Sequence, residues 1–226
     1  MCGRFVLFSS VNKISREFAV LPENIAFSPN YNIAPTQEIL IVVAERERSL
    51  IKCRWGFIPP WAKDPDIGYK MINARAETLA EKPVFKSAIR THRCLVVADG
   101  FYEWKREGRE KKPLYVHLKS GRPLGFAGLY SYWQATEGDL ICTCTIITTS
   151  ANHLLEPIHN RMPAIIPADI RAEWLDPENQ DEKRILSLLS PYAAEDMEAY
   201  YVSQNVNFYR NDSPDNIRPV RAEGDT

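Results

Sequence analysis

Strand-like alternation and short β-branched runs dominate the hydrophobic pattern of this chain. Residues 37–45 (QEILIVVAE) and 49–57 (SLIKCRWGF) are rich in β-branched residues and flank a charged turn, so they predict a β-hairpin. Five further strand-like segments follow between residues 93 and 149, and another begins at Glu198. Gly108, within the turn REGREK, suits a hairpin reversal. The pattern therefore predicts a mainly antiparallel sheet.

Helical spacing is confined to short segments. Ser10 can cap a helix over the following residues VNKISREF, because a serine oxygen accepts a hydrogen bond from an otherwise free N–H of the first turn. Apolar positions at helical spacing also predict short helices over residues 83–90, 167–175 and 181–189. We therefore predict an α+β fold with a mainly antiparallel, barrel-like β-sheet core and short flanking helices.

The length of 226 residues suits one domain, which we expect over residues 1–218, with a flexible tail over residues 219–226. Neither GxGxxG nor GxxxxGK[ST] occurs, and no βαβ rhythm is present, so nucleotide binding is not predicted. The start of the chain lacks the apolar stretch of a signal peptide, and no run is as long as a membrane span. We expect a cytoplasmic protein.

The cysteine pattern argues against a metal site and a disulfide framework. The chain has five cysteines, none of them in a C-x-x-C pair, and an odd number without a signal peptide disfavours structural disulfides. Four of them lie in apolar, strand-like surroundings, where small buried side chains are expected: Cys53, Cys94, Cys142 and Cys144.

Charge is distributed unevenly along a chain whose formal net charge is only -1. Residues 70–112 contain eleven Lys and Arg against six Asp and Glu, a net charge of +5, whereas residues 156–200 contain four against ten, a net charge of -6. The basic segment includes Phe101, Tyr102 and Trp104, and cations with interleaved aromatics suit a channel for single-stranded nucleic acid. On charge alone, an exposed strand surface explains this segment better.

Cys2 is the sharpest chemical signal. Removal of Met1 would expose an N-terminal β-aminothiol, whose amine and thiol titrate at roughly 7.7 to 8.0 and about 8.5 in unperturbed peptides. Such an amine condenses with an aldehyde to an imine, and the neighbouring thiol can close the imine into a thiazolidine ring. An incidental cysteine on a frayed terminus explains Cys2 by itself equally well.

Three further polar residues have candidate roles, each with a structural alternative. Asn73, in the motif NARAE with Arg75, could hold a sugar or phosphate, although a helix N-cap is the simpler role. Glu103, between aromatic residues on a strand, could serve general acid–base chemistry, or it could point outward in ordinary alternation. His159, in a loop with proline at both ends, could transfer protons or simply bond the backbone.

Taken together, these segments resemble one family. MCGRF, YNIAPTQ, WGFIPPWAKD, NARAET, CLVVADGFYEWK and IHNRMPAII follow one another in the order typical of the SOS response-associated peptidase family, whose members are also called abasic site processing proteins. The matches cover most of residues 2–166, and the co-occurrence of several individually ordinary motifs makes the resemblance specific.

The resemblance implies a function and a set of site residues. It implies that Cys2 bonds covalently to abasic sites in single-stranded DNA through a thiazolidine, that Asn73 senses the abasic sugar, that Glu103 is catalytic and that His159 stabilises the abasic site. It also implies a compact α+β fold and a self-processing peptidase activity. We expect no cofactor, no metal and no membrane partner, and a DNA-associated monomer. The residues expected along the DNA path are Arg4, Pro35, Trp61, Arg75 and Thr148.

Three other functions remain open at this point. An N-terminal-nucleophile amidotransferase can also begin Met-Cys-Gly, but it needs a longer chain and a glutamine-binding motif, neither of which is evident. A non-enzymatic single-strand binding module would bind intact and abasic strands reversibly and with strong salt dependence. A thiol protease using Cys2 and His159 would need a peptide cleft that the sequence does not disclose.

Overall fold

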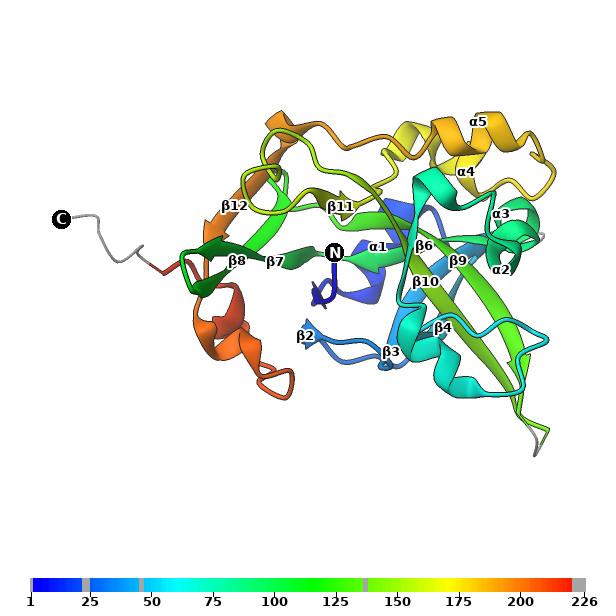
Figure 1. Cartoon of the computed structure of the whole chain (residues 1–226), viewed down its shortest axis with the longest axis horizontal. Coiled ribbons are helices and arrows are strands. Elements are labelled where there is room, and N and C mark those ends of the chain that lie inside the picture. The colour runs from blue at the N-terminus through cyan, green and yellow to red at the C-terminus, as the bar shows by residue number, and fades with distance from the viewer. Residues whose placement is uncertain (1, 22–24, 45–46, 136–137, 221–226) are drawn as a thin grey trace.

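Two β-sheets form the framework of the protein (Figure 1). The structure is a computed structural model and describes residues 2–21, 25–44, 47–135 and 138–220. The smaller sheet has five strands, in the spatial order β12 (Met197–Tyr201), β8 (Glu110–Leu118), β7 (Gly100–Glu107), β1 (Phe5–Leu7) and β2 (Asn30–Ile33).

The larger sheet closes into a barrel. Its strands follow the order β11 (Arg161–Pro163), β10 (Leu140–Ser150), β4 (Arg48–Trp55), β3 (Glu38–Ala44), β6 (Arg93–Ala98) and β9 (Leu124–Gln134), with β5 (Asn73–Arg75) paired to β10. Because β9 also pairs with β10, the strands β10, β4, β3, β6 and β9 form a closed ring. The pairings of β10 with β4 and with β5 are parallel, and the other pairings are antiparallel. The predicted α+β, barrel-like and mainly antiparallel fold is confirmed.

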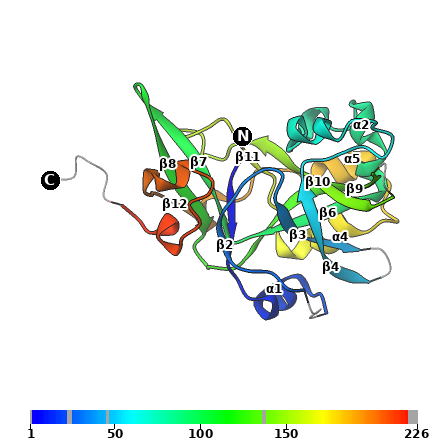
Figure 2. The same cartoon turned by 90° about the horizontal axis from the view of Figure 1, so that it is seen from below.

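Short helices cover the sheets. The α-helices are α1 (Val11–Phe18), α2 (Pro83–Lys86), α3 (Ala88–Thr91), α4 (Arg171–Leu175) and α5 (Glu182–Ser187). The 3-10 helices are η1 (Pro65–Lys70), η2 (Ala76–Thr78), η3 (Ala168–Ile170), η4 (Ala194–Asp196), η5 (Gln204–Asn207) and η6 (Pro214–Ile217). Figures 1 and 2 place α2 to α5 around the barrel and α1 on another side of it. Among the described residues, no helix combines the length and the apolar character needed to cross a membrane.

Most predicted elements are present with shifted ends. The predicted hairpin is β3 and β4, paired from Glu38 with Arg54 to Ala44 with Arg48, although residues 45–46 of its turn lie outside the described residues. The Ser10 side chain caps α1 by accepting a hydrogen bond from the Lys13 N–H. The helix predicted over residues 83–90 is divided into α2 and α3.

The end of the chain is described as far as residue 220. Pro219 forms an isolated bridge with Val202, and the Val220 N–H donates to the Tyr201 carbonyl at 2.9 Å. The remainder of the predicted tail, residues 221–226, lies outside the described residues.

An aromatic cluster joins the two sheets. The ring of Phe5 on β1 lies 5.2 Å from Trp55 on β4 and 6.0 Å from Phe126 on β9, and Phe101 on β7 lies 5.9 Å from Phe126. All four side chains are buried. Because β1 follows Cys2 almost directly, this packing fixes the N-terminal strand against the barrel.

The cysteines are free thiols. Cys53, Cys94 and Cys144 are buried as expected, whereas Cys142 is only half-buried. The Cys142 and Cys53 sulfur atoms lie 2.7 Å apart on neighbouring strands. Among the described residues, no group of three or more His, Cys, Asp and Glu side chains is arranged to hold a metal ion.

The basic segment 70–112 does not form one continuous patch. Arg93 is buried, and its guanidinium donates to backbone carbonyls that include those of Trp174 and Ile89. Lys105 and Lys112, at the other end of the segment, both pair with Glu107. The cations of this segment thus lie on separate elements, and several of them are buried or already paired.

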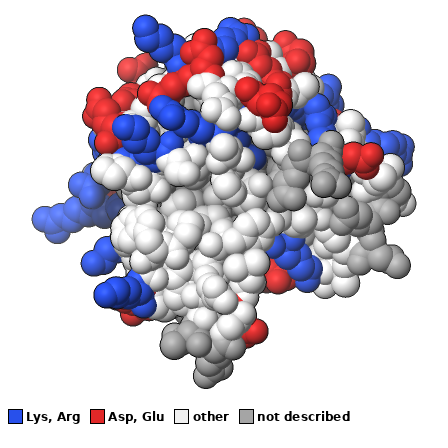
Figure 3. Space-filling model, turned by 90° about the vertical axis from the view of Figure 1, so that its right-hand side faces the viewer, with Lys and Arg blue, Asp and Glu red and all other residues white. Residues whose placement is uncertain are grey.

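Figure 3 shows how charge is arranged on the side of the molecule that carries the helical region. Acidic and basic side chains gather along the top of this face, where Figure 1 places α4 and α5. The middle of the face is largely uncharged, with basic side chains along its left edge.

Candidate functional site around the N-terminal cysteine

Cys2 lies three residues before the first residue of β1 and is completely buried. Its carbonyl accepts a hydrogen bond of 2.8 Å from the Asn73 side-chain amide, and its thiol lies 3.9 Å from the Arg4 carbonyl. The Tyr102 N–H donates to the Arg4 carbonyl at 3.0 Å, which extends the β1–β7 pairing toward Cys2. From Cys2 onward, the N-terminal segment is thus held by a strand and a side chain.

Glu103 follows Tyr102 on β7 and is buried, with 4% of its surface exposed. Burial raises the pKa of the Cys2 thiol well above its usual range, and the nearby Glu103 carboxylate raises this pKa further. The alternative that Glu103 points outward is wrong, because β7 is covered on both faces at this point. A buried carboxylate beside a buried, protonated thiol is an arrangement suited to proton transfer.

Asn73 belongs to β5 and does not cap a helix. Strand β5 pairs in parallel with β10, with Asn73 opposite Ile146 and Arg75 opposite Thr148. The amide nitrogen of Asn73 donates to the Cys2 carbonyl, whereas its buried Oδ1 has no hydrogen-bond partner among the described residues. This oxygen therefore offers an acceptor beside Cys2 to a hydroxyl group of a ligand.

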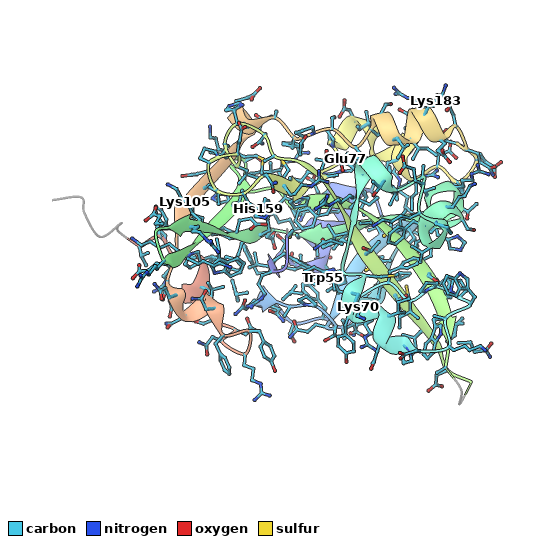
Figure 4. All side chains as sticks on the ribbon, in the orientation of Figure 1. Trp55, Lys70, Glu77, Lys105, His159 and Lys183 are labelled. Atoms are coloured by element: carbon cyan, nitrogen blue, oxygen red, sulfur yellow. The ribbon has the colours of Figure 1, made fainter. Side chains whose placement is uncertain are left out.

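His159 is half-buried in the loop that precedes β11, at the position labelled in Figure 4. The Arg161 N–H donates to its Nδ1 atom at 2.9 Å. Because Nδ1 is the acceptor, the neutral ring carries its proton on Nε2. His159 can therefore present a hydrogen-bond donor, and in its charged form an acid, to a bound group.

Arg161 ties the His159 loop to the segment of Asn73. Its guanidinium makes two bonds to the Glu77 carboxylate, of 2.5 and 2.9 Å, and a third of 2.5 Å to the Thr148 carbonyl. The pairing with Arg161 lowers the pKa of Glu77. The strands β5 and β11 both pair with the end of β10. The ion pair of Arg161 and Glu77 therefore adds a side-chain link at the place where these strands meet.

Residues expected along the DNA path occupy different environments. Arg75 on β5 is exposed, and 68% of the Trp61 surface is exposed. Thr148 is completely buried and donates its hydroxyl to the Ala74 carbonyl at 3.3 Å, so it holds β5 on β10. Pro35 is half-buried in the turn between β2 and β3.

The turn containing Pro35 holds a residue in an unusual conformation. Thr36 has φ 76°, in the left-handed region that β-branched residues rarely adopt. Its N–H donates to the Trp55 carbonyl at 2.8 Å, which fixes the turn against the end of β4. Such conformations persist where the surroundings enforce them, and they gather at functional sites.

Arg4 is turned toward the C-terminal part of the chain. One guanidinium nitrogen donates to Asn32 Oδ1 at 2.6 Å and to the Val206 carbonyl at 2.9 Å, and the group lies 5.9 Å from the Trp104 ring. Burial lowers the pKa of Arg4. The sequence did not indicate this connection, because the segment after residue 173 carried no motif. Asn32, an asparagine within the segment YNIAPTQ, was the available signal.

The chain matches a family model described as SOS response associated peptidase (SRAP) over residues 1–209. It is 51% identical over 222 residues to a Bacillus subtilis protein named abasic site processing protein YoqW, covering 96% of this chain and 99% of that protein. It is also 32% identical over 221 residues to abasic site processing protein HMCES of Xenopus tropicalis, covering 84% of this chain and 65% of that one.

A solved structure shows the same fold. A crystal structure of a protein from Bacteroides thetaiotaomicron superposes with a TM-score of 0.89 at 27% identity, covering 97% of this chain and 100% of that one.

Proposed function

This chain belongs to the SOS response associated peptidase family, and from that premise we propose that it processes abasic sites by bonding Cys2 covalently to them in single-stranded DNA. The relatives named above are called abasic site processing proteins, which supports a role in DNA repair. The observation that carries the proposal is the environment of Cys2, whose carbonyl is held by Asn73 and whose thiol lies near Glu103.

The reaction begins with the α-amine of Cys2. Met1 must first be removed, because the Met1–Cys2 peptide bond otherwise occupies this nitrogen. The freed amine adds to the C1′ aldehyde of the ring-opened abasic sugar, and loss of one water gives an imine. The Cys2 sulfur then bonds to the imine carbon while the thiol proton passes to nitrogen, which closes a thiazolidine without oxidant or reductant.

The neighbouring side chains supply proton transfer and orientation. Glu103 accepts the thiol proton and returns it to nitrogen, because a buried thiol with a raised pKa does not ionise by itself near neutral pH. Asn73 Oδ1 accepts a hydrogen bond from a sugar hydroxyl. His159 donates from Nε2 to an oxygen of the opened sugar, with its ring held by the Arg161 N–H.

The experiment is a denaturing gel with protein lacking Met1 and an oligonucleotide bearing one abasic site. We expect a shifted band with the wild-type protein and none with Cys2→Ala. An intact strand and a tetrahydrofuran analogue, which cannot open to an aldehyde, serve as matched controls and should give no band. A version with one residue fused before Cys2 should also be inert.

Each alternative outcome has a definite meaning. A band that persists in Cys2→Ala would overturn the assignment of Cys2. Binding that is seen in native gels but vanishes on denaturation, for intact and abasic strands alike, would instead establish a reversible single-strand binding protein.

A further inference from the structure

The exposed aromatic side chains lie in two separate places. Among the described residues, four aromatic side chains are strongly exposed, two around η1 and two directly after η5: Trp61 at 68%, Tyr69 at 57%, Phe208 at 55% and Tyr209 at 45%. In Figures 1 and 2 the blue N-terminal segment of the chain lies between the orange-to-red C-terminal segment and the side of the barrel that carries α2. Lys70, at the end of η1, is labelled in Figure 4. The segments that carry the two aromatic groups thus lie on different sides of the N-terminal segment.

The second group is attached to the site by hydrogen bonds. The Asn32 side-chain amide donates to the carbonyls of Phe208 and Asn211, at 3.1 and 2.9 Å, while its Oδ1 accepts from Arg4. Arg4 also donates to the Val206 carbonyl. Arg4 is two residues from Cys2, so the position of this loop is fixed relative to the nucleophile. Binding to a preorganised loop costs little conformational entropy.

The loop also carries a cation. The Arg210 guanidinium lies 5.6 Å from the Tyr209 ring, its Nε donates to the Tyr209 hydroxyl at 3.1 Å, and it forms no ion pair with the described residues. The nearby carboxylate of Asp212 accepts a hydrogen bond of 2.7 Å from the Tyr31 N–H. The Phe208 and Tyr209 ring centroids are 5.8 Å apart. Exposed aromatic faces beside an available cation suit an unpaired base and its phosphate.

We propose that Phe208, Tyr209 and Arg210 form a stacking platform for unpaired bases that flank the abasic site, on the side of Cys2 opposite η1. The proposal rests on the proposed function, because the platform binds the same DNA strand that Cys2 attacks. A nucleotide of the strand is the expected occupant, because its base has a π-face for the rings and its phosphate complements Arg210. The link through Asn32 and Arg4 makes the platform continuous with the site.

The test measures reversible binding apart from the covalent step. Fluorescence anisotropy would use labelled oligonucleotides carrying the tetrahydrofuran analogue, with unpaired bases on the 5′ side only, on the 3′ side only, or on both. The double variant Phe208→Ser/Tyr209→Ser should bind about tenfold to hundredfold more weakly per stacked base. This loss should appear only for strands whose unpaired bases lie on the side that reaches the platform, either 5′ or 3′ of the abasic site. Leu140→Ser is the matched control, because Leu140 is 66% exposed on β10 and should bind DNA like the wild type.

Two further measurements make the test specific. A 2-aminopurine base in the flanking position should be quenched by the wild-type protein and by Leu140→Ser, but not by the double variant. Arg210→Gln should reduce the slope of log affinity against log salt by about 0.7, the loss of one phosphate contact on a single strand. Thermal melts of all variants should coincide, because the replaced side chains are exposed.

Equal affinity and equal quenching in the double variant and the wild type would overturn the platform. So would unchanged DNA binding together with loss of self-association in sedimentation experiments, which would assign the aromatic pair to contacts between copies of the chain. Crosslinking by the wild-type protein tests the proposed function separately. If the wild type crosslinks and the double variant binds normally, only the platform fails.

Discussion

At Cys2, burial favours the protonated thiol, whereas the proposed reaction needs the sulfur as a nucleophile. Burial and the Glu103 carboxylate both raise the pKa of the thiol, so the folded protein keeps the thiol protonated in a range where an unfolded chain begins to lose that proton, about pH 8.5. The contribution to stability is therefore present below this pH and is lost as the pH rises above it. A protonated thiol is also a poor nucleophile, so the proposed reaction needs a carboxylate beside it.

We expect slow alkylation of Cys2. In folded protein lacking Met1, iodoacetamide should modify Cys2 at least about tenfold more slowly at pH 8.5 than in a peptide of the same N-terminal sequence. Glu103→Gln should lower the thiol pKa, because the neighbouring negative charge is removed, and should shift the alkylation profile toward lower pH. Peptide mass spectrometry at a series of pH values gives the rates. A profile that does not move in Glu103→Gln would contradict the coupling of the two groups.

The same substitution tests catalysis. Glu103→Gln preserves the shape of the side chain but cannot accept a proton, so crosslinking under saturating abasic DNA should slow by about a hundredfold or more. The control is Glu38→Gln, which removes an exposed carboxylate paired with Lys52 on the barrel. Single-turnover rates from quenched gels measure the effect. An undiminished rate would exclude Glu103 from the proton-transfer role.

At the scale of elements, the bidentate pair of Arg161 and Glu77 connects β11 with the segment that follows β5. Glu77 is half exposed, so the pair itself contributes only about 0–1 kcal/mol to stability. Its position matters more, because Arg161 also donates its backbone N–H to His159. The lowered pKa of Glu77 keeps the pair intact at pH values above the ordinary range for Glu, and the pair is lost as the pH falls through the lowered value.

Breaking this pair should affect crosslinking more than stability. Glu77→Gln should leave the free energy of unfolding within about 1 kcal/mol of wild type and slow crosslinking several-fold, because the His159 ring is less well held. The matched control is Glu173→Gln, which breaks the similar pair with Arg184 on the distant α4–α5 region. Urea denaturation and single-turnover rates give the two quantities. Equal effects of both variants on crosslinking would show that the Glu77 pair does not position the site.

The elements also show what sequence patterns can and cannot predict. The hairpin of β3 and β4 and the capped helix α1 follow from alternation and a capping serine, which are local signals. Asn73 was ambiguous because an asparagine suits both a helix cap and a strand that contacts the N-terminus. Glu103 was ambiguous because alternation assumes one solvated face, whereas β7 is covered on both faces near Cys2.

At the scale of the whole molecule, the closed barrel packs against the second sheet through four aromatic rings, those of Phe5, Trp55, Phe101 and Phe126. The sequence predicted a barrel-like sheet and the local hairpin of β3 and β4, but not which distant strands pair, since the hydrophobic pattern specifies faces and not partners. For that reason the sequence did not predict the parallel pairing of β5 with β10. It also did not predict the contact between Arg4 and Val206, which are 202 positions apart.

Removing the central ring of this packing should be costly. Phe126→Ala should lower the free energy of unfolding by about 3–5 kcal/mol, because it leaves a cavity between the barrel and the second sheet. Leu140→Ala, at an exposed site, should change this free energy by less than about 0.5 kcal/mol. Urea denaturation measures both changes from the shift of the midpoint, with the slope of the unfolding free energy against urea concentration held constant. A loss below about 1 kcal/mol for Phe126→Ala would mean that the two sheets do not depend on this cluster.

The most direct test of the central claim is the mass and attachment site of the DNA adduct. The account predicts that the adduct weighs as much as the protein without Met1 plus the ring-opened abasic oligonucleotide, less one water, and that fragmentation after nuclease digestion places the modification on Cys2. Attachment to a lysine, or an adduct that still contains Met1, would contradict it.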